Sequence, residues 1–283
     1  MINPKVPKNI YFIHYDNVTS GKPQNFLFVN YLCIKSAIIQ NPKYKVYLIT
    51  NNKDILNDYA DIKKKVKLII EKPISKIFGH KLVLVQHSSD IRRIRLLYDL
   101  GGIYMDTDEF CVKPFDSLDI QDYDVVAGNI NKKQIGIGLI IAVPKCKIFR
   151  TWLYKYKNFQ GNNFQGYENK KHTVNIKKFA KENRTEQLNF YLGDSVGTFT
   201  TLVENERKLK ILRLHKKITY FPSTFWLDLK DFFDNPKMDY PDSIVHHLWQ
   251  SLTRKFIDPL TIEDLNKNAY FYRKAKEVYE HAI

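Results

Sequence analysis

Residues 88–108 read SSDIRRIRLLYDLGGIYMDTD, and this stretch decides the fold because it predicts a helix, a glycine turn, a buried strand and two carboxylates in that order. From Ile91 onward, apolar residues recur at the spacing of one helix face, while the neighbouring arginines point elsewhere. One of residues 88–90 can cap the start of this helix. Gly101–Gly102 supplies the backbone conformations that end a helix and reverse the chain. We therefore expect a one-sided helix that leads directly into a strand.

Two carboxylates follow that strand. Alternation along it puts Tyr104, Asp106 and Asp108 on one face. Alternate positions on one side of a strand lie roughly 6.5 Å apart. One hydrated Mg²⁺ or Mn²⁺ can bridge that separation, with phosphate oxygens filling the rest of its shell. Without a cation the two carboxylates would repel, and one would keep its proton. The pattern therefore predicts a site for a metal ion and a diphosphate.

The rest of the chain alternates between strand and helix patterns. We expect strands at 9–15, 45–50, 66–71, 123–129 and 135–143, and helices at 25–40, 73–85 and 147–159. Repeated alternation implies an α/β fold with a mostly parallel central sheet, helices on both faces and ligands at the carboxyl ends of the strands. Asp106 and Asp108 come at such an end.

Length and composition bound the domain organisation. With 283 residues and 44% hydrophobic content the chain can bury a full core, and no long linker rich in proline, glycine or serine divides it. We expect one domain over residues 1–283, with a polar, variable helical region at about 160–206 and a C-terminal helical segment at about 261–283. The sequence contains no signal-like segment and no apolar run long enough to span a membrane. Three cysteines without metal-like spacing fit a reducing compartment. These features predict a protein that is cytoplasmic or peripheral to the cytoplasmic face of a membrane.

The net charge of +15 favours anionic partners. Lysines concentrate at 63–67, 170–181 and 208–217. Solvated lysine-rich faces are the plainest reading of this charge, and peripheral association with an anionic membrane would also use it. No zinc finger, RNA-binding aromatic motif or basic leucine zipper occurs, so we expect no nucleic-acid partner.

Residues 90–108, continued by Val112–Phe115, resemble the signature of the sugar transferases that contain a DXD motif. This family, glycosyltransferase family 32, includes yeast-type initiating α-mannosyltransferases and bacterial capsular-polysaccharide transferases, and it is related to the clostridial glucosylating toxins. Val6–Tyr15 is similar to the family's first strand. Ile244–Ser251 is similar to its C-terminal motif H-H-x-x-x-S-W, with Leu252 at the tryptophan position. The resemblance implies a GT-A-type, Rossmann-like nucleotide-sugar-binding fold and glycosyltransferase activity.

The resemblance also implies roles for individual residues. Asp106 and Asp108 would be the catalytic, metal-binding carboxylates, and His247 or His246 would complete the metal shell. A strand aims only one of two adjacent histidines inward, and counting back from Leu252 favours His247. The donor-binding residues would be Ile13, His14, Tyr15, Asp90, Arg93, Tyr104, Asp106 and Ser251.

The implied reaction moves a sugar from a UDP- or GDP-sugar to a hydroxyl of a glycan, polysaccharide or glycoconjugate, with Mn²⁺ or Mg²⁺ as cofactor and retention of the donor's α-configuration. Departure of the diphosphate is the barrier, and a divalent cation offsets its charge. The region at about 160–206 would face the acceptor. The sequence shows no dedicated catalytic nucleophile.

Two other classes of protein are alternatives. Metal-dependent phosphohydrolases that form an aspartyl-phosphate also carry D-x-D after an apolar strand, but they have a small residue where this chain has Phe110, and their chains begin with that strand. A non-enzymatic polyanion-binding protein would explain the charge and leave the signature unexplained.

Overall fold

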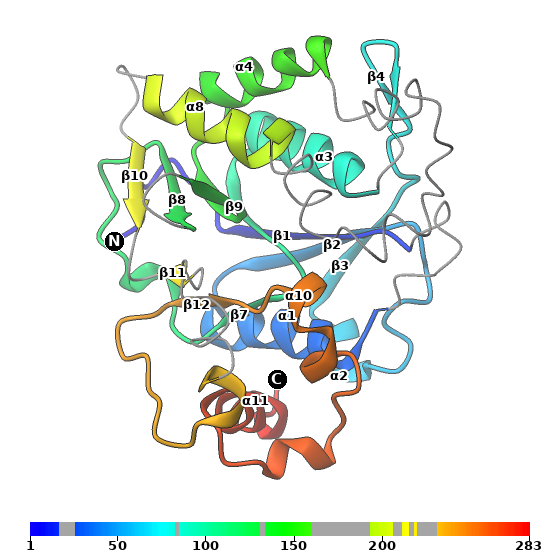
Figure 1. Ribbon diagram of the computed structural model, residues 1–283, viewed down its shortest axis with the longest axis vertical. Coiled ribbons are helices and arrows are strands. Elements are labelled where there is room, and N and C mark those ends of the chain that lie inside the picture. The colour runs from blue at the N-terminus through cyan, green and yellow to red at the C-terminus, as the bar shows by residue number, and fades with distance from the viewer. Residues whose placement is uncertain are drawn as a thin grey trace, which may run out of the picture.

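The computed structural model describes residues 1–16, 26–82, 85–130, 134–159, 193–205, 211–214, 218–219 and 231–283. Figure 1 shows these residues as a central sheet with helices above and below it. Most of the predicted variable region lies outside the described residues. Its described end, residues 193–205, contains a π-helix, Gly193–Gly197, and α8, Thr198–Asn205. The division into domains stays a prediction.

A seven-stranded sheet runs through the described residues in the order β10-β8-β9-β6-β1-β2-β3. Its strands are β1 (Asn9–His14), β2 (Lys45–Thr50), β3 (Val66–Ile70), β6 (Gly102–Met105), β8 (Val125–Asn129), β9 (Ile135–Ala142) and β10 (Ile211–Leu214). Only β9 runs antiparallel to its neighbours within this described sheet. The predicted α/β class with a mostly parallel sheet is therefore confirmed.

Helices cover both faces of the sheet (Figure 1). One face carries α3 (Val85–Leu100), α4 (Lys147–Lys155) and α8, and the other carries α1 (Phe28–Gln40), α2 (Ala60–Lys63) and α11 (Tyr270–Glu280). The remaining described helices are α10 (Gln250–Ile257) and the 3₁₀ turns η1 (Phe115–Ser117), η2 (Tyr156–Asn158) and η4 (Glu263–Asn266). None of the helices in the described part of the chain is long and apolar enough to cross a bilayer.

Two smaller sheets flank the main one. In the first, β12 (Val245–His247) pairs with β11 (Ile218–Thr219) and, antiparallel, with β7 (Glu109–Cys111). The second is a hairpin of β4 (Lys76–Ile77) and β5 (His80–Lys81), so the predicted helix at 73–85 is wrong. Phe78 and Gly79 join these strands with φ of 48° and 87°. Two successive positive φ values are typical of a tight hairpin turn and end any helix there.

The signature helix starts earlier than predicted. Since α3 begins at Val85, residues 88–90 lie inside it and do not cap it. Ser88 instead binds the chain before the helix, where its Oγ accepts a hydrogen bond from the Ile74 N–H at 2.6 Å. The glycine turn is confirmed, with φ of 62° at Gly101 and 102° at Gly102. A Cβ on Gly101 would lie 2.6 Å from the nitrogen of Pro144, so the turn also needs the absence of a side chain.

Candidate active site

Asp106 and Asp108 lie in a turn and not on a strand. β6 ends at Met105, and β7 begins at Glu109, so the predicted alternation does not reach the carboxylates. The Asp106 N–H donates to the Gly138 carbonyl of β9 at 2.8 Å, and the Glu109 N–H donates back to the Asp106 carbonyl at 3.0 Å. These two hydrogen bonds close the turn. Because β6 runs parallel to β1, the turn leaves the sheet at the edge where β1 also ends.

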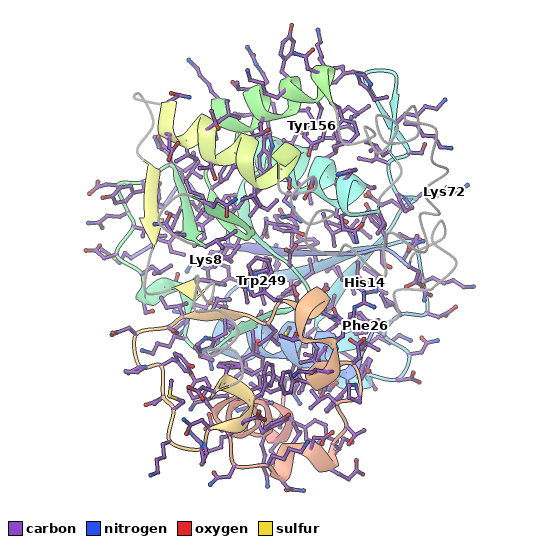
Figure 2. The ribbon with its side chains drawn as sticks, viewed as in Figure 1. Lys8, His14, Phe26, Lys72, Tyr156 and Trp249 are labelled. Carbon is purple, nitrogen blue, oxygen red and sulfur yellow. The ribbon has the colours of Figure 1, made fainter. Side chains whose placement is uncertain are left out.

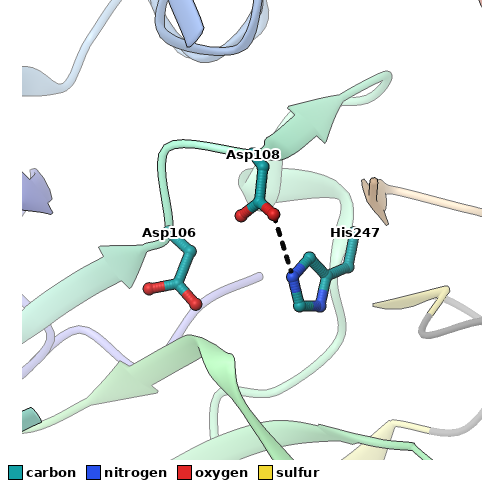
Figure 3. A group of neighbouring side chains, drawn as sticks. All are labelled: Asp106, Asp108 and His247. Atoms are coloured by element: carbon teal, nitrogen blue, oxygen red, sulfur yellow. Dashed lines mark ion pairs between the residues drawn. The ribbon is translucent and has the colours of Figure 1, made fainter. Parts of the chain in front are cut away.

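His247 joins the two carboxylates from the far end of the sequence (Figure 3). One donor atom each from Asp106, Asp108 and His247 lie within 4.8 Å of one another. His247 Nε2 is 3.4 Å from Asp108 Oδ2. The pairing of β12 with β7 places His247 directly opposite Glu109 and thus beside the turn. Two carboxylate oxygens and one imidazole nitrogen are a donor set that suits a borderline divalent ion such as Mn²⁺.

His246 faces away from this cluster. Its side chain is fully buried, and its Nε2 lies 3.1 Å from the Tyr270 hydroxyl of α11. The ring packs against Phe232 and Tyr240. Burial lowers the pKa of His246 to about 3, so it stays neutral. The structure therefore brings His247, and not His246, to the carboxylates, because successive side chains of a strand point to opposite faces.

The cluster has a surplus of negative charge. Burial alone would lower the pKa of His247, but the Asp108 and Glu109 carboxylates raise it to about 9. Burial would raise the pKa of Asp108, yet His247 and the Gln250 N–H hold it below its usual value. The pKa of Asp106 is raised by burial and by Asp108, against the pull of Arg93. A group of carboxylates that favours a proton on the nearby imidazole also favours a divalent cation in its place. The residues present therefore fit a metal ion.

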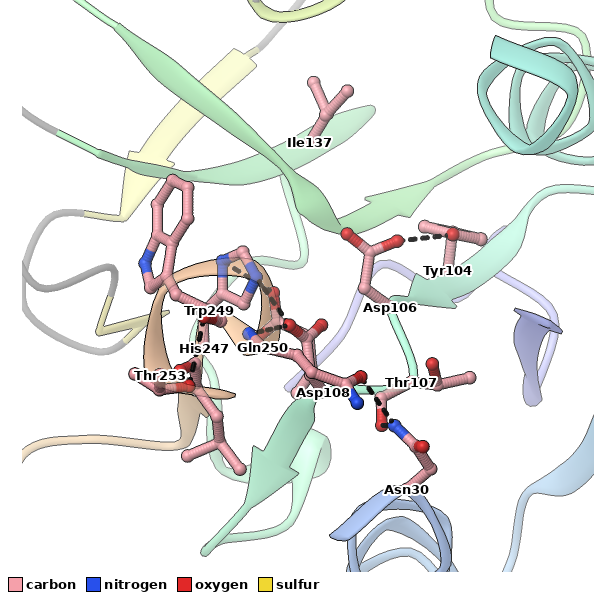
Figure 4. Close-up of polar contacts among 12 residues, drawn as sticks. Asn30, Tyr104, Asp106, Thr107, Asp108, Ile137, His247, Trp249, Gln250 and Thr253 are labelled. Atoms are coloured by element: carbon pink, nitrogen blue, oxygen red, sulfur yellow. Dashed lines mark hydrogen bonds and ion pairs between the residues drawn. The ribbon is translucent and has the colours of Figure 1, made fainter. Parts of the chain in front are cut away.

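Helix α10 begins at this cluster. The Gln250 N–H, in the first turn of α10, donates to Asp108 Oδ2 at 2.8 Å, which also places the carboxylate at the positive end of the helix dipole. Trp249 caps α10 with φ of 53°, and its ring stacks on His247 with centroids 4.4 Å apart (Figure 4). This stacking fixes the plane of the imidazole ring.

Asn30 of α1 connects three segments that are distant in sequence. Its side chain is fully buried, and its Nδ2 donates to the Thr107 carbonyl at 3.0 Å and to Gln250 Oε1 at 3.2 Å (Figure 4). Its Oδ1 accepts from the Leu27 N–H at 2.8 Å. Asn30 therefore holds the carboxylate turn and the start of α10 in one arrangement.

Arg93 and Asp90 of α3 lie behind Asp106. Both are buried, with exposed fractions of 2% and 0%. Arg93 Nη2 is 3.3 Å from Asp90 Oδ1 and 3.0 Å from Asp106 Oδ1, while Nη1 donates to the Ile137 carbonyl at 2.6 Å. The guanidinium also lies 4.3 Å from the ring centroid of Tyr104, whose hydroxyl donates to Asp106 Oδ1 at 2.5 Å. Of these predicted donor-binding residues, Arg93 and Tyr104 therefore contact Asp106 directly, and Asp90 contacts Arg93.

The end of β1 places the other predicted donor residues at the same edge. Ile13, His14 and Tyr15 are all buried. His14 packs edge-on against Phe26 with centroids 5.4 Å apart (Figure 2), and the Tyr15 hydroxyl donates to Glu71 Oε1 at 2.6 Å. The side chain of Ser251 lies outside the described part of the structure.

Asp16 was not singled out by the sequence analysis. Its Oδ2 accepts from Asn52 Nδ2 at 2.9 Å, and its N–H donates to Asn51 Oδ1 at 2.8 Å. A polar cluster therefore follows the ends of both β1 and β2. No motif marked it, because asparagines after a strand are common in loops.

Glu109 and Gly138 were also not predicted from the sequence. Glu109 is fully buried, and its Oε1 lies 3.8 Å from His247 Nδ1. A Cβ on Gly138 would lie 2.4 Å from Glu109 Oε1 and 3.0 Å from Asp106 Oδ2. Gly138 is therefore the residue that leaves room for these two carboxylates, a role that appears only when β9 lies against the turn.

The region around the candidate site is similar to known proteins. Residues 29–124 match the family model described as the glycosyltransferase sugar-binding region containing the DXD motif. The chain is 21% identical over 283 residues to glucan organizing enzyme 1 of Cryptococcus neoformans var. grubii. The alignment covers 95% of this chain and 69% of that protein. The matched family segment contains α1, α3 and the turn with Asp106 and Asp108.

Two glycosyltransferases are among the solved structures to which the chain is similar. The PaToxG glycosyltransferase is 18% identical to this chain, with a TM-score of 0.44. The superposition covers 71% of this chain and 70% of the PaToxG chain. The glycosyltransferase GlyE of Streptococcus pneumoniae TIGR4 is 12% identical, with a TM-score of 0.43 over 98% of this chain and 61% of its own.

Proposed function

We propose, from the match of residues 29–124 to the family model of the glycosyltransferase sugar-binding region containing the DXD motif, a metal-dependent, retaining enzyme that moves a sugar from a nucleotide-sugar to a hydroxyl acceptor. The observation that supports this proposal most directly is the cluster of Asp106, Asp108 and His247, whose donor atoms lie within 4.8 Å of one another at the edge where the β1 and β6 strands end. This is the edge at which α/β sheets bind their ligands.

The residues of the cluster and those around it would have different roles. Asp106, Asp108 and His247 would hold Mn²⁺ or Mg²⁺, which when bound offsets the negative charge of the departing nucleoside diphosphate. Asn30 and the Gln250 N–H keep the turn and the Asp108 carboxylate in place before any ligand arrives. Such preorganisation lowers the cost of rearrangement during the reaction.

The donor would lie along the ends of β1 and β2. Asp16, with Asn51 and Asn52, offers the hydrogen-bonding groups that a ribose or a base of UDP or GDP needs. In the proposed reaction the acceptor hydroxyl attacks from the face that the diphosphate leaves, and the α-configuration is kept. The acceptor would be a glycan, polysaccharide or glycoconjugate.

The proposal includes a cytoplasmic location, free or against the cytoplasmic face of a membrane. The net charge of +15 supports contact with an anionic surface. Cys33, Cys111 and Cys146 are all buried thiols, which supports a reducing compartment.

The experiment is a thermal-shift screen of UDP- and GDP-sugars with and without Mn²⁺, followed by NMR of the product's anomeric configuration. A ligand that binds only the folded protein raises its melting temperature. We expect one donor to stabilise wild-type protein in Mn²⁺ and to lose that effect in Asp108→Asn.

Asp116→Asn is the matched control, because Asp116 binds Lys8 and Tyr44 at the amino ends of β1 and β2 and removal of its charge leaves the cluster intact. Equal stabilisation of both variants by every donor would contradict the metal assignment. An inverted product would contradict retention.

A further inference from the structure

Glu109 is a third carboxylate beside the proposed metal ligands, and the proposed reaction leaves it without a role. Its side chain is fully buried, which is costly for a carboxylate that serves no purpose. It directly follows Asp108 in the chain and is the first residue of β7. Asp108 lies beside Nε2 of the His247 ring, whereas Glu109 lies beside Nδ1. Its geometry relative to that ring carries the inference.

The imidazole of His247 lies between two carboxylates. Its Nε2 is 3.4 Å from Asp108 Oδ2, and its Nδ1 is 3.8 Å from Glu109 Oε1. A neutral imidazole carries one N–H and one lone pair, and only the nitrogen with the lone pair can bind a metal. Since Nε2 is the nitrogen that faces Asp108, it would be the one to bind the ion, and the proton would then belong on Nδ1, toward Glu109.

Three features keep this arrangement in place. The antiparallel pairing of β7 with β12 puts Glu109 and His247 directly opposite each other, so both side chains leave the same face at close range. The stacked ring of Trp249 fixes the imidazole plane. Gly138 leaves the space that the Glu109 carboxylate fills, because a Cβ there would lie 2.4 Å from Oε1.

We propose that Glu109 is a positioning residue whose carboxylate, 3.8 Å from Nδ1, favours the His247 proton on that nitrogen and thereby presents the Nε2 lone pair to the metal ion. A carboxylate behind a ligating histidine fixes its tautomer and raises its basicity. The inference rests on the proposed function, because it requires a divalent ion at Asp106, Asp108 and His247.

The test measures Mn²⁺ affinity of the full chain by electron paramagnetic resonance, without donor or acceptor. Loss of such an outer partner typically weakens metal binding by about 10- to 100-fold. We expect that loss for Glu109→Gln, which keeps the shape of the side chain. Asp116→Asn is the control and should bind as wild type does.

A second measurement separates positioning from a general effect of charge. Long-range ¹H–¹⁵N NMR of the Mg²⁺-loaded protein reports which ring nitrogen of His247 carries the proton, with the resonance assigned by its loss in His247→Ala. We expect the proton on Nδ1 in wild-type protein. A proton on Nε2, or an unchanged Mn²⁺ affinity in Glu109→Gln, would overturn the inference while leaving the proposed function intact. Failure of wild-type protein to bind Mn²⁺ at all would overturn both.

Discussion

Replacement of Arg93 by methionine tests whether the buried network behind Asp106 is structural. Methionine keeps much of the apolar stem, so the change removes chiefly the charge and its hydrogen bonds. The variant leaves Asp90, which is fully buried, without the guanidinium that lies 3.3 Å away, and it leaves the Ile137 carbonyl without its donor at 2.6 Å. Removal of one partner from a buried ion pair costs about 3 to 5 kcal/mol. We expect the free energy of unfolding to fall by that amount.

The assay is urea denaturation of metal-free protein followed by far-UV circular dichroism. The double variant Asp90→Asn, Arg93→Met removes the charge of Asp90, which has lost its partner. It should therefore recover at least half of the lost free energy of unfolding. Mn²⁺-supported binding should weaken equally for a nucleotide-sugar and for its nucleoside diphosphate, because Arg93 acts through Asp106. A loss below about 1 kcal/mol would refute the structural role. Selective loss of the nucleotide-sugar would instead support the sugar contact that the resemblance implies.

Three further changes test two residues of the site and one buried histidine of α3, His87. Asp108→Asn should abolish Mn²⁺-dependent transfer and cost no more than about 2 kcal/mol in stability, because an amide oxygen can still accept the Gln250 N–H; retained turnover would contradict this. Asn30→Ala should lower stability by about 1 to 3 kcal/mol in urea and also weaken Mn²⁺ binding, and an unchanged affinity would show that the turn needs no support. Burial lowers the pKa of His87 to about 4, against about 6.5 in the unfolded chain. Between these pH values only the unfolded state takes up a proton, so the free energy of unfolding falls as the pH drops from about 6.5 to about 4. At about 1.4 kcal/mol for each pKa unit, His87→Leu should remove about 3 kcal/mol of that acid sensitivity, and identical pH profiles for both proteins would contradict it.

The parts of the fold that depend on local pattern were predictable from the sequence. β2 occupies the predicted residues 45–50, and β1 and β3 end one residue short of their predictions. The failures arise where a local pattern had more than one solution. The segment at 73–85 was predicted as a helix, but two positive φ values at Phe78 and Gly79 make part of it a hairpin, and α3 begins at Val85, earlier than predicted.

The sequence motifs point to the candidate metal ligands but not to the residues that support them. Asp106, Asp108 and His247 carry a recognisable motif, whereas Asn30 and Glu109 carry none. Their positions follow from tertiary packing: Asn30 meets a carbonyl 77 residues away, and Glu109 meets His247 through the β7–β12 pairing. The alternation that predicted both carboxylates on one face failed because the strand ends at Met105, and the turn brings them together instead.

The distance along the chain between the two halves of the metal site has a consequence for its synthesis. The carboxylates lie at 106–109 and the imidazole at 247, a difference of 138 residues from Glu109. At about 5 to 20 residues per second, a ribosome needs roughly 7 to 28 s to pass from one to the other. During that time β7 has no β12 to pair with, and the carboxylates have neither the imidazole nor the Gln250 N–H beside them. The nascent chain is thus unable to bring Asp106, Asp108 and His247 together until residue 247 has been made, so the proposed metal ion would be captured late in synthesis.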